Sequence, residues 1–238
     1  MIAGIIPARL GSTRFPRKIL ADIAGKPMLI RVAEQAAKAT LLDRVIVAVD
    51  DPDVAALVAN HGFEALLTAP DHPSGTDRVA EVARKLKPEI VINIQGDEPR
   101  MDPDIIDGLV QECERNKAAL VTAVSTDLTP TDFMNPNVVK ARLDAQGRAL
   151  TFLRDVPLKE SGGYYRHLGM YGYSGALLER FTALPPSEHE RQYRLEQWRA
   201  LDHDLPVVCI ITNYPYRGID TPEDLNQLGP IHDSDETS

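Results

Sequence analysis

The stretch IAGIIPARLGSTRFPRK, residues 2–18, joins an apolar run to a basic loop and decides the fold of the chain. Ile2 to Ile6 are typical of a strand buried inside a sheet. Four cations follow within ten residues, and the first acidic residue is Asp22; the cations are Arg9, Arg14, Arg17 and Lys18. Because the strand holds these cations at the edge of a core, we expect the loop to bind a small anion.

Composition limits the classes of function that the chain can have. It has 238 residues, a formal net charge of -9 and 43% hydrophobic residues, enough for a sizeable core. The acidic balance argues against a general nucleic-acid or membrane-surface binder, which needs an extended basic face. Cys113 and Cys209 lack a CxxC or a nearby His, so we expect both to be reduced packing residues. The sequence shows no secretory leader and no membrane span, which predicts a cytoplasmic protein.

Apolar runs of strand length alternate with segments of helical period along the chain, which predicts an α/β fold with a mainly parallel sheet covered on both faces. Strands are expected at residues 2–8, 44–51, 63–68, 89–99, 119–128 and 206–213. Helices are expected at residues 27–37, 52–60, 77–86, 102–116, 187–201 and 220–228.

The pattern changes after residue 128. Residues 138–154 predict an antiparallel hairpin around a turn at Asp144 to Gly147. We therefore expect one domain over residues 1–228, with a small antiparallel lobe at about 129–185. Residues 229–238 have no apolar period and are expected to form a flexible tail.

The opening loop has the residue types of a phosphate site. Gly11 lets backbone amides turn inward, Ser12 and Thr13 add hydroxyl donors, and the cations supply charge, so a triphosphate would suit the loop. The loop matches neither GxxxxGK[ST] nor GxGxxG, the two commonest nucleotide signatures. The alternative is a solvated loop whose arginines pair with surface acids.

Two further stretches carry acidic residues toward the same site. The strand that ends in Gln95-Gly96-Asp97 delivers a carboxylate to the sheet edge that holds the basic loop, where Mg²⁺ could bind with substrate phosphates. The alternative is that Asp97 and Glu98 cap the helix at Pro103 or open a turn. In GIDTPEDL, residues 218–225, Thr221 and Asp224 predict a capped helix start, and Asp220 is left over and could project into a cleft. The alternative, which this stretch alone favours, is that Asp220 only belongs to the helix cap.

Seven motifs in order resemble the 3-deoxy-manno-octulosonate (Kdo) cytidylyltransferases over residues 2 to about 228. They are IIPARLGSTRFPRK, HPSGTDRVAE, NIQGDEP, NPNVVK, RHLGMYGY, LEQWR and GIDTPEDL. The resemblance implies a nucleotide-diphospho-sugar transferase fold and a homodimer formed through the antiparallel lobe. It also implies a reaction, in which CTP and a Kdo-type sugar acid give the CMP-sugar and pyrophosphate for lipopolysaccharide biosynthesis, with Mg²⁺ as cofactor.

The resemblance also assigns roles to residues. The nucleotide contacts would be Ala8, Arg9, Gly11, Arg14, Lys18, Ser74, Gly75, Arg78, Gln95 and Asp97. The catalytic residues would be Arg9, Lys18, Asp97 and Asp220, and the two aspartates would ligate magnesium. The sugar contacts would be Arg154, His167, Tyr171, Glu196 and Gln197. Two alternatives stay open: His167 and Tyr171 as core groups bonded to backbone, and Glu196 and Gln197 as a solvated helix face.

The chain departs from the family pattern at three places, which are Arg17-Lys18-Ile19, Leu153-Arg154-Asp155 and Tyr193. The last two fall in the sugar lobe, so 8-amino-Kdo or another keto-deoxy sugar acid, such as a sialic-acid relative, is an alternative acceptor. A non-sugar-acid acceptor such as a polyol phosphate is a second alternative. A nucleotide-binding regulator without turnover is a third, and the presence of both Asp97 and Asp220 disfavours it.

Overall fold

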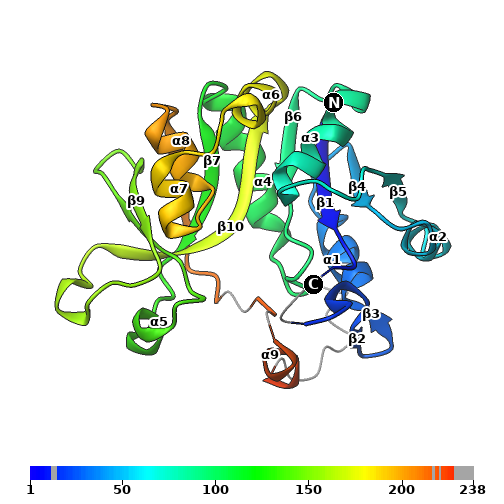
Figure 1. The fold of residues 1–238 in the computed structure, drawn as a ribbon, viewed down its shortest axis with the longest axis horizontal. Coiled ribbons are helices and arrows are strands. Elements are labelled where there is room, and N and C mark those ends of the chain that lie inside the picture. The colour runs from blue at the N-terminus through cyan, green and yellow to red at the C-terminus, as the bar shows by residue number, and fades with distance from the viewer. Residues whose placement is uncertain (12–14, 216–217, 220, 228–238) are drawn as a thin grey trace.

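The computed structural model describes residues 1–11, 15–215, 218–219 and 221–227, and its centre is a mixed sheet (Figure 1). The strand order is β11-β7-β10-β6-β1-β4-β5, and β8 joins β10 to β9 at one side. These strands are β1 (Ile2–Ala8), β4 (Arg44–Val49), β5 (Glu64–Leu67), β6 (Ile90–Asn93), β7 (Leu120–Ser125), β8 (Lys140–Leu143), β9 (Ala149–Leu153), β10 (Tyr164–Ser174) and β11 (Val207–Thr212). A two-stranded ribbon, β2 (Asp22–Ile23) and β3 (Lys26–Pro27), lies outside the sheet.

Helices cover both faces of the sheet. They are α1 (Met28–Ala36), α2 (Pro52–Asn60), α3 (Gly75–Leu86), α4 (Pro103–Arg115), α5 (Pro130–Met134), α6 (Gly175–Ala183), α7 (Glu188–Tyr193), α8 (Gln197–Asp202) and α9 (Pro222–Gln227). Ile6 packs in a core with α1, α2 and α4, whereas its neighbour Ile5 packs in a second core with α3, α6 and α8. Successive side chains of a strand point to opposite faces, so β1 needs apolar residues at both positions. The predicted α/β fold is confirmed.

Strand β6 joins the two halves of the sheet. It pairs in parallel with β1, where Asn93 is opposite Ile5, and antiparallel with β10, where Asn93 is opposite Tyr171. The carboxyl end of β6 therefore lies between the basic loop after β1 and the middle of the long strand β10.

The predicted hairpin is confirmed as β8 and β9, with Gly147 at a φ of 77° in the turn. Strand β8 pairs with the start of β10, where Lys140 is opposite Arg166. In Figure 1 the hairpin extends away from the parallel strands β1, β4 and β5. The hairpin is therefore a side branch of the same sheet, joined to it through β10, and not a separate sheet.

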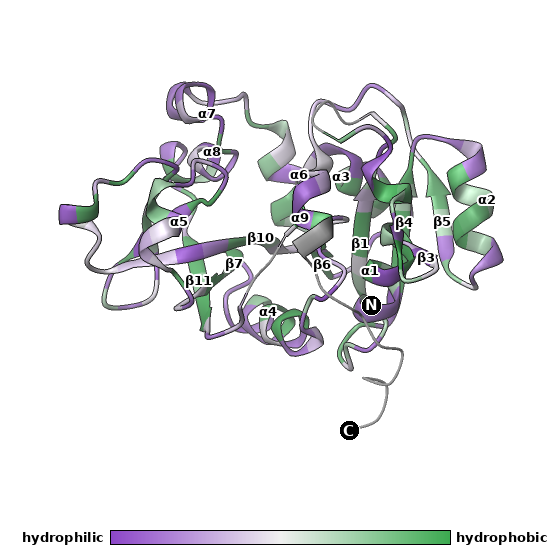
Figure 2. Cartoon of the chain, turned by 90° about the horizontal axis from the view of Figure 1, so that it is seen from below, coloured by the Kyte–Doolittle hydropathy of each residue, from purple (hydrophilic) through white to green (hydrophobic). Residues whose placement is uncertain are grey.

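The prediction of one helix over residues 187–201 is wrong. The segment forms α7 and α8, and Arg194 ends α7 in the left-handed conformation with a φ of 53°. Arg199 of α8 pairs with Glu190 of α7 through contacts of 2.9 and 2.6 Å. Residues nine positions apart in one helix lie about 13 Å apart along its axis, so this ion pair requires the break. Figure 2 shows that α7 is largely hydrophilic, which is the pattern that suggested a continuous charged helix.

Both cysteines are buried and free, as predicted, on α4 and β11. Burial raises the pKa of the Cys113 thiol and of the Cys209 thiol to about 12, so both stay protonated at neutral pH. Among the helices that the structure describes, none is long and apolar enough to cross a bilayer.

Gly175 begins α6, where its amide donates to Glu89 O at 2.9 Å and an added Cβ would overlap the carbonyl oxygen of Pro88. Because a backbone atom cannot move aside cheaply, we expect Gly175→Ala to lower the free energy of unfolding by about 1–3 kcal/mol. Urea unfolding measures the change. Gly162→Ala is the matched control, since nothing lies within 4 Å of the added Cβ. Equal stability of the two variants would contradict the packing described here.

Candidate functional site

The smaller of two adjoining cavities, about 300 Å³, lies where β1, α3 and β6 meet. It is lined by the predicted nucleotide contacts Ala8, Arg9, Gly11, Lys18, Ser74, Gly75, Arg78, Gln95 and Asp97. Pro7, Ile19, His72, Pro73 and Gly96 complete the lining and were not predicted. The predicted contact Arg14 lies outside the described residues.

Lys18 and Asp97 form an ion pair in the lining of this cavity. Lys18 Nζ donates to Asp97 Oδ2 at 2.7 Å, and the two side chains are 13% and 29% exposed. The pair joins the loop after β1 to the loop after β6, as the common edge of parallel strands predicts. The alternative role of capping the next helix is wrong, because Asp102 accepts the capping hydrogen bond from Asp104 N. The alternative of a turn is confirmed, since Met101 N donates to Glu98 O at 3.2 Å.

The backbone of the C-terminal motif is held against Asp97. The amide of Ile219 donates to Asp97 O at 3.1 Å, and Ile219 is buried. Thr221 and Asp224 exchange the predicted capping hydrogen bonds at the start of α9. Asp220 lies outside the described residues.

The start of α3 forms another side of the smaller cavity. Ser74 caps the helix by accepting from Asp77 N at 3.1 Å. The guanidinium of Arg78 is almost fully buried and donates to Asp50 at 3.2 Å and to Thr68 Oγ1 at 2.5 Å. These bonds hold Arg78 rigidly at the cavity wall.

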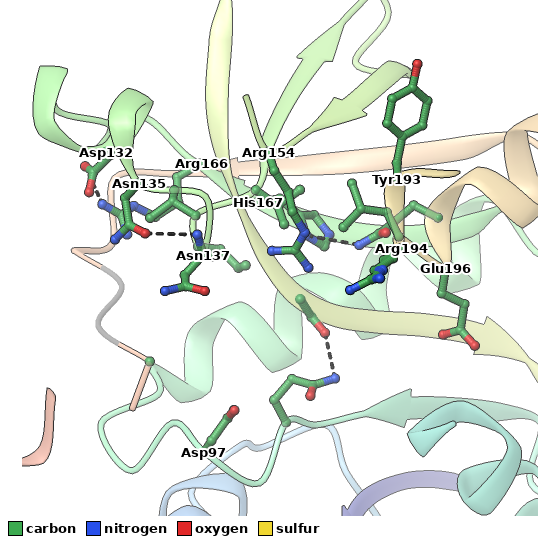
Figure 3. A pocket seen from close by; sticks show the side chains of 18 of the residues that line it. Asp97, Asp132, Asn135, Asn137, Arg154, Arg166, His167, Tyr193, Arg194 and Glu196 are labelled. Carbon is green, nitrogen blue, oxygen red and sulfur yellow. Dashed lines mark hydrogen bonds and ion pairs between the residues drawn. The ribbon is translucent and has the colours of Figure 1, made fainter. Parts of the chain in front are cut away.

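The larger cavity, about 800 Å³, lies beside β10 and contains all five predicted sugar contacts (Figure 3). They are Arg154, His167, Tyr171, Glu196 and Gln197. Gln95 and Asp97 line both cavities, so the two spaces meet at the carboxyl end of β6. Gln95 is fixed there by donating to Gly169 O at 3.0 Å.

Buried polar groups form the floor of the larger cavity. Thr122 Oγ1 donates to Met170 O at 2.7 Å, so at its 2.9 Å contact with His167 Nε2 the hydroxyl accepts and the ring nitrogen donates. Burial lowers the pKa of His167 to about 3, so the ring is neutral. Gln197 Nε2 donates to Tyr171 Oη at 2.5 Å, which leaves Gln197 Oε1 buried without a partner.

Glu196 connects the two cavities. Its carboxylate oxygens accept from Ser74 Oγ at 3.1 Å and from Thr76 Oγ1 at 2.5 Å, both at the start of α3. Burial raises the pKa of Glu196 above its usual value. The alternative of a solvated helix face for Glu196 and Gln197 is therefore wrong.

Comparison with known proteins agrees with this arrangement. Residues 3–205 match the family described as Cytidylyltransferase. A 3-deoxy-manno-octulosonate cytidylyltransferase of Syntrophobacter fumaroxidans is 46% identical over 241 residues, covering 97% of this chain and 96% of the relative. The chain belongs to this cytidylyltransferase family. A further relative of that name, from Polynucleobacter necessarius, is 43% identical and covers 94% of this chain and 92% of its own.

A solved structure supports the same assignment for the cytidylyltransferase. The CMP:2-keto-3-deoxy-manno-octonic acid synthetase, described in complex with CTP, superposes with a TM-score of 0.89 at 35% identity. The match covers 95% of this chain and 96% of that one. The predicted family and fold are confirmed, and the chain is a CTP-dependent nucleotidyltransferase.

Sequence reasoning missed several polar residues of this cytidylyltransferase that line the larger cavity, which are Asp132, Asn135, Asn137, Arg166 and Arg194. Asp132 and Arg166 form an ion pair of 2.5 Å. Burial of Asp132 opposes ionisation, but hydrogen bonds from Thr129 and Arg166 hold the pKa of Asp132 below its usual value. Asn135 and Asn137 belong to the NPNVVK motif, so that motif was the available signal.

The neutral state of His167 makes stability depend on pH. The pKa is about 3 in the folded enzyme and ordinarily 6.5, so the unfolded chain binds the extra proton between these values. Stability from this group is complete above pH 6.5 and is lost as pH falls toward 3. Between pH 7 and pH 5 we expect wild type to lose about 2 kcal/mol more unfolding free energy than His167→Gln does. Urea unfolding at both pH values measures this, and equal losses would refute a neutral buried ring.

Proposed function

We propose that the enzyme transfers CMP from CTP to 3-deoxy-manno-octulosonate and releases pyrophosphate. The observation that carries the proposal is the meeting of the two cavities at Gln95 and Asp97. One cavity presents the cations and helix start that suit a nucleotide, and the other presents the polar groups that suit a sugar acid. Reacting groups of the two substrates would meet where the cavities join.

The nucleotide cavity neutralises phosphate charge without a covalent intermediate. Exposed Arg9 and half-buried Lys18 both line this cavity, so a triphosphate bound there would meet two cations. The start of α3 at Gly75 adds the partial positive charge of a helix N-terminus. In the proposed step, an oxygen of the sugar attacks the α-phosphorus while the bond to the leaving pyrophosphate breaks. The residues of the chain therefore orient the substrates and offset charge.

Magnesium fits the junction of the two cavities. Asp97 offers a partly exposed carboxylate there, and Mg²⁺ binds one or two carboxylates together with substrate phosphates. Asp97 and Asp220 would hold the ion, and the Ile219 to Asp97 backbone hydrogen bond supports bringing the two aspartates together. When bound, the ion would supply positive charge to the phosphates and lower the pKa of a coordinated sugar hydroxyl. Lys18 would then exchange its contact with Asp97 for a phosphate oxygen.

The larger cavity suits a polyhydroxylated acid. The unpartnered Gln197 Oε1 can accept from a sugar hydroxyl, and the amides of Asn135 and Asn137, which line the same cavity, can donate or accept. Arg154 supplies a cation, with Nη1 held by Pro136 O at 2.9 Å. The CMP-sugar that the enzyme releases would serve lipopolysaccharide biosynthesis. We place the reaction in the cytoplasm, where CTP is available.

Pyrophosphate release with CTP, Mg²⁺ and Kdo tests the reaction. We expect turnover with Kdo in preference to 8-amino-Kdo and N-acetylneuraminate, and loss of turnover when EDTA removes the metal.

Asp97→Asn should reduce kcat at least about 100-fold, because it removes charge at the reacting centre. Asp53→Asn is the matched control on the exposed start of α2. Preference for another acceptor, or an Asp97→Asn variant as active as the control, would contradict the proposal.

We also propose that the enzyme is a homodimer formed through the antiparallel lobe. Three large apolar side chains of the lobe are exposed, which are Met134, Leu150 and Leu158 at 69, 50 and 49%. A second copy of the chain packed on the lobe would remove these side chains from water.

Sedimentation measures the dimer directly. We expect wild type to sediment at twice the chain mass and Leu150→Glu to shift toward the monomer, because burial of a charge at an interface is costly. Leu67→Glu, at an equally exposed leucine on β5, is the control and should leave the mass unchanged. A monomeric wild type, or dissociation caused equally by both variants, would contradict this interface.

A further inference from the structure

Arg194 stands at the wall of the larger cavity in a conformation that arginine rarely adopts. It ends α7 with a φ of 53°, and its amide donates to Glu190 O. Glycine or asparagine usually occupies such a left-handed position after a helix. In Figure 3 the Arg154 and Arg194 side chains extend into the same cavity from two walls. The turn at Arg194 thus adds a guanidinium to the cavity that Glu196 and Gln197 also line.

The acidic groups around this cavity already have partners. Asp97 accepts from Lys18, and Asp132 pairs with Arg166. Asp224 accepts from Thr221, and Glu196 accepts from Ser74 and Thr76. Among the described residues, these four carboxylates contact other side chains, and none of them is bonded to Arg194.

The three arginines of the cavity differ in how many of their guanidinium donors are bonded within the protein. Arg166 is paired with Asp132 and also donates from Nε to Asp127 O. Arg154 uses Nη1 on a backbone carbonyl. Within the described part of the chain, Arg194 makes no hydrogen bond or ion pair through its guanidinium, although it lines the cavity. Its planar fork of donors is therefore available to an anionic ligand.

We propose that Arg194 binds the carboxylate of the sugar acid and so sets the preference of the enzyme for an acidic acceptor. The inference rests on the proposed function, because it names the part of the acceptor that this side chain holds. A guanidinium matches a carboxylate with two parallel hydrogen bonds, and Arg154 lines the same cavity as a second cation. An acceptor phosphate would offer related chemistry, so it forms one arm of the test.

Steady-state kinetics test the role of Arg194. Arg194→Gln should raise KM for Kdo about 10- to 100-fold and leave KM for CTP within about twofold, as loss of one charge-assisted contact predicts. Arg194→Lys should recover part of the loss. Arg191→Gln is the matched control, because Arg191 is exposed on the same helix and donates to Pro186 O outside the cavity. Unchanged KM for Kdo, or an equal rise for both substrates, would overturn the proposal.

Acceptor analogues identify the group that Arg194 contacts. With a Kdo analogue whose carboxylate is reduced to an alcohol, wild type and Arg194→Gln should have equal kcat/KM. A defect of the variant that persists with this analogue would show that Arg194 does not act through the carboxylate. A wild type that prefers a polyol phosphate, with Arg194 required for it, would overturn the carboxylate assignment.

Direct binding separates this proposal from the proposed reaction. If wild type releases no pyrophosphate with Kdo, calorimetry of Kdo binding to wild type and Arg194→Gln still tests the contact. Binding to wild type alone would support Arg194 and refute the reaction, whereas equal or absent binding would overturn the role of Arg194. Arg194→Gly controls for loss of folding, because glycine adopts the left-handed backbone conformation of this position without strain. This variant should keep the melting temperature of wild type and lose affinity for Kdo.

Discussion

The pairing of β6 with β1 on one side and β10 on the other is the constraint on which the site depends. Asn93 is opposite Ile5 in the parallel ladder and opposite Tyr171 in the antiparallel one. The residues that follow β6 therefore lie between the basic loop and the wall formed by β10. Gln95 and Asp97 line both cavities for this reason. The parallel neighbour β1 leads into the basic loop of the smaller cavity, and the antiparallel neighbour β10 carries His167 and Tyr171 of the larger one.

The distribution of charge explains how a chain with a formal charge of -9 can favour anionic substrates. Acids inside the site are bonded to neighbours: Asp97 to Lys18, and Glu196 to Ser74 and Thr76. Arg9 and Arg194 are exposed at the cavity walls. The bonding of these acids to neighbouring side chains, rather than the net charge of the chain, therefore sets the sign of the charge at the cavity walls.

The fold and the approach of the basic loop to Asp97 were accessible from sequence because they depend on local patterns, whereas the other nucleotide contacts and the five sugar contacts came from the resemblance to the family. β1 and α2 begin and end at the predicted residues, 2–8 and 52–60, since an apolar run and a Pro after an Asp cap define them. Parallel strands bring their carboxyl ends to one edge, so the meeting of Lys18 and Asp97 followed from topology. The acceptor side depends instead on tertiary contacts. The Arg199 to Glu190 pair separates α7 from α8, and only that break brings Arg194 to the cavity.

Electron density for both substrates in one crystal tests the central claim most directly. A CTP analogue with a methylene group between the α- and β-phosphorus atoms would hold the complex before transfer, with the sugar acid and Mg²⁺ present. The account predicts the nucleotide beside Arg9 and Ser74, the sugar acid beside His167, and the reacting oxygen about 3–3.5 Å from the α-phosphorus near Asp97. A sugar acid bound outside the larger cavity, or reacting atoms separated by the side chains of Gln95 and Asp97, would contradict it.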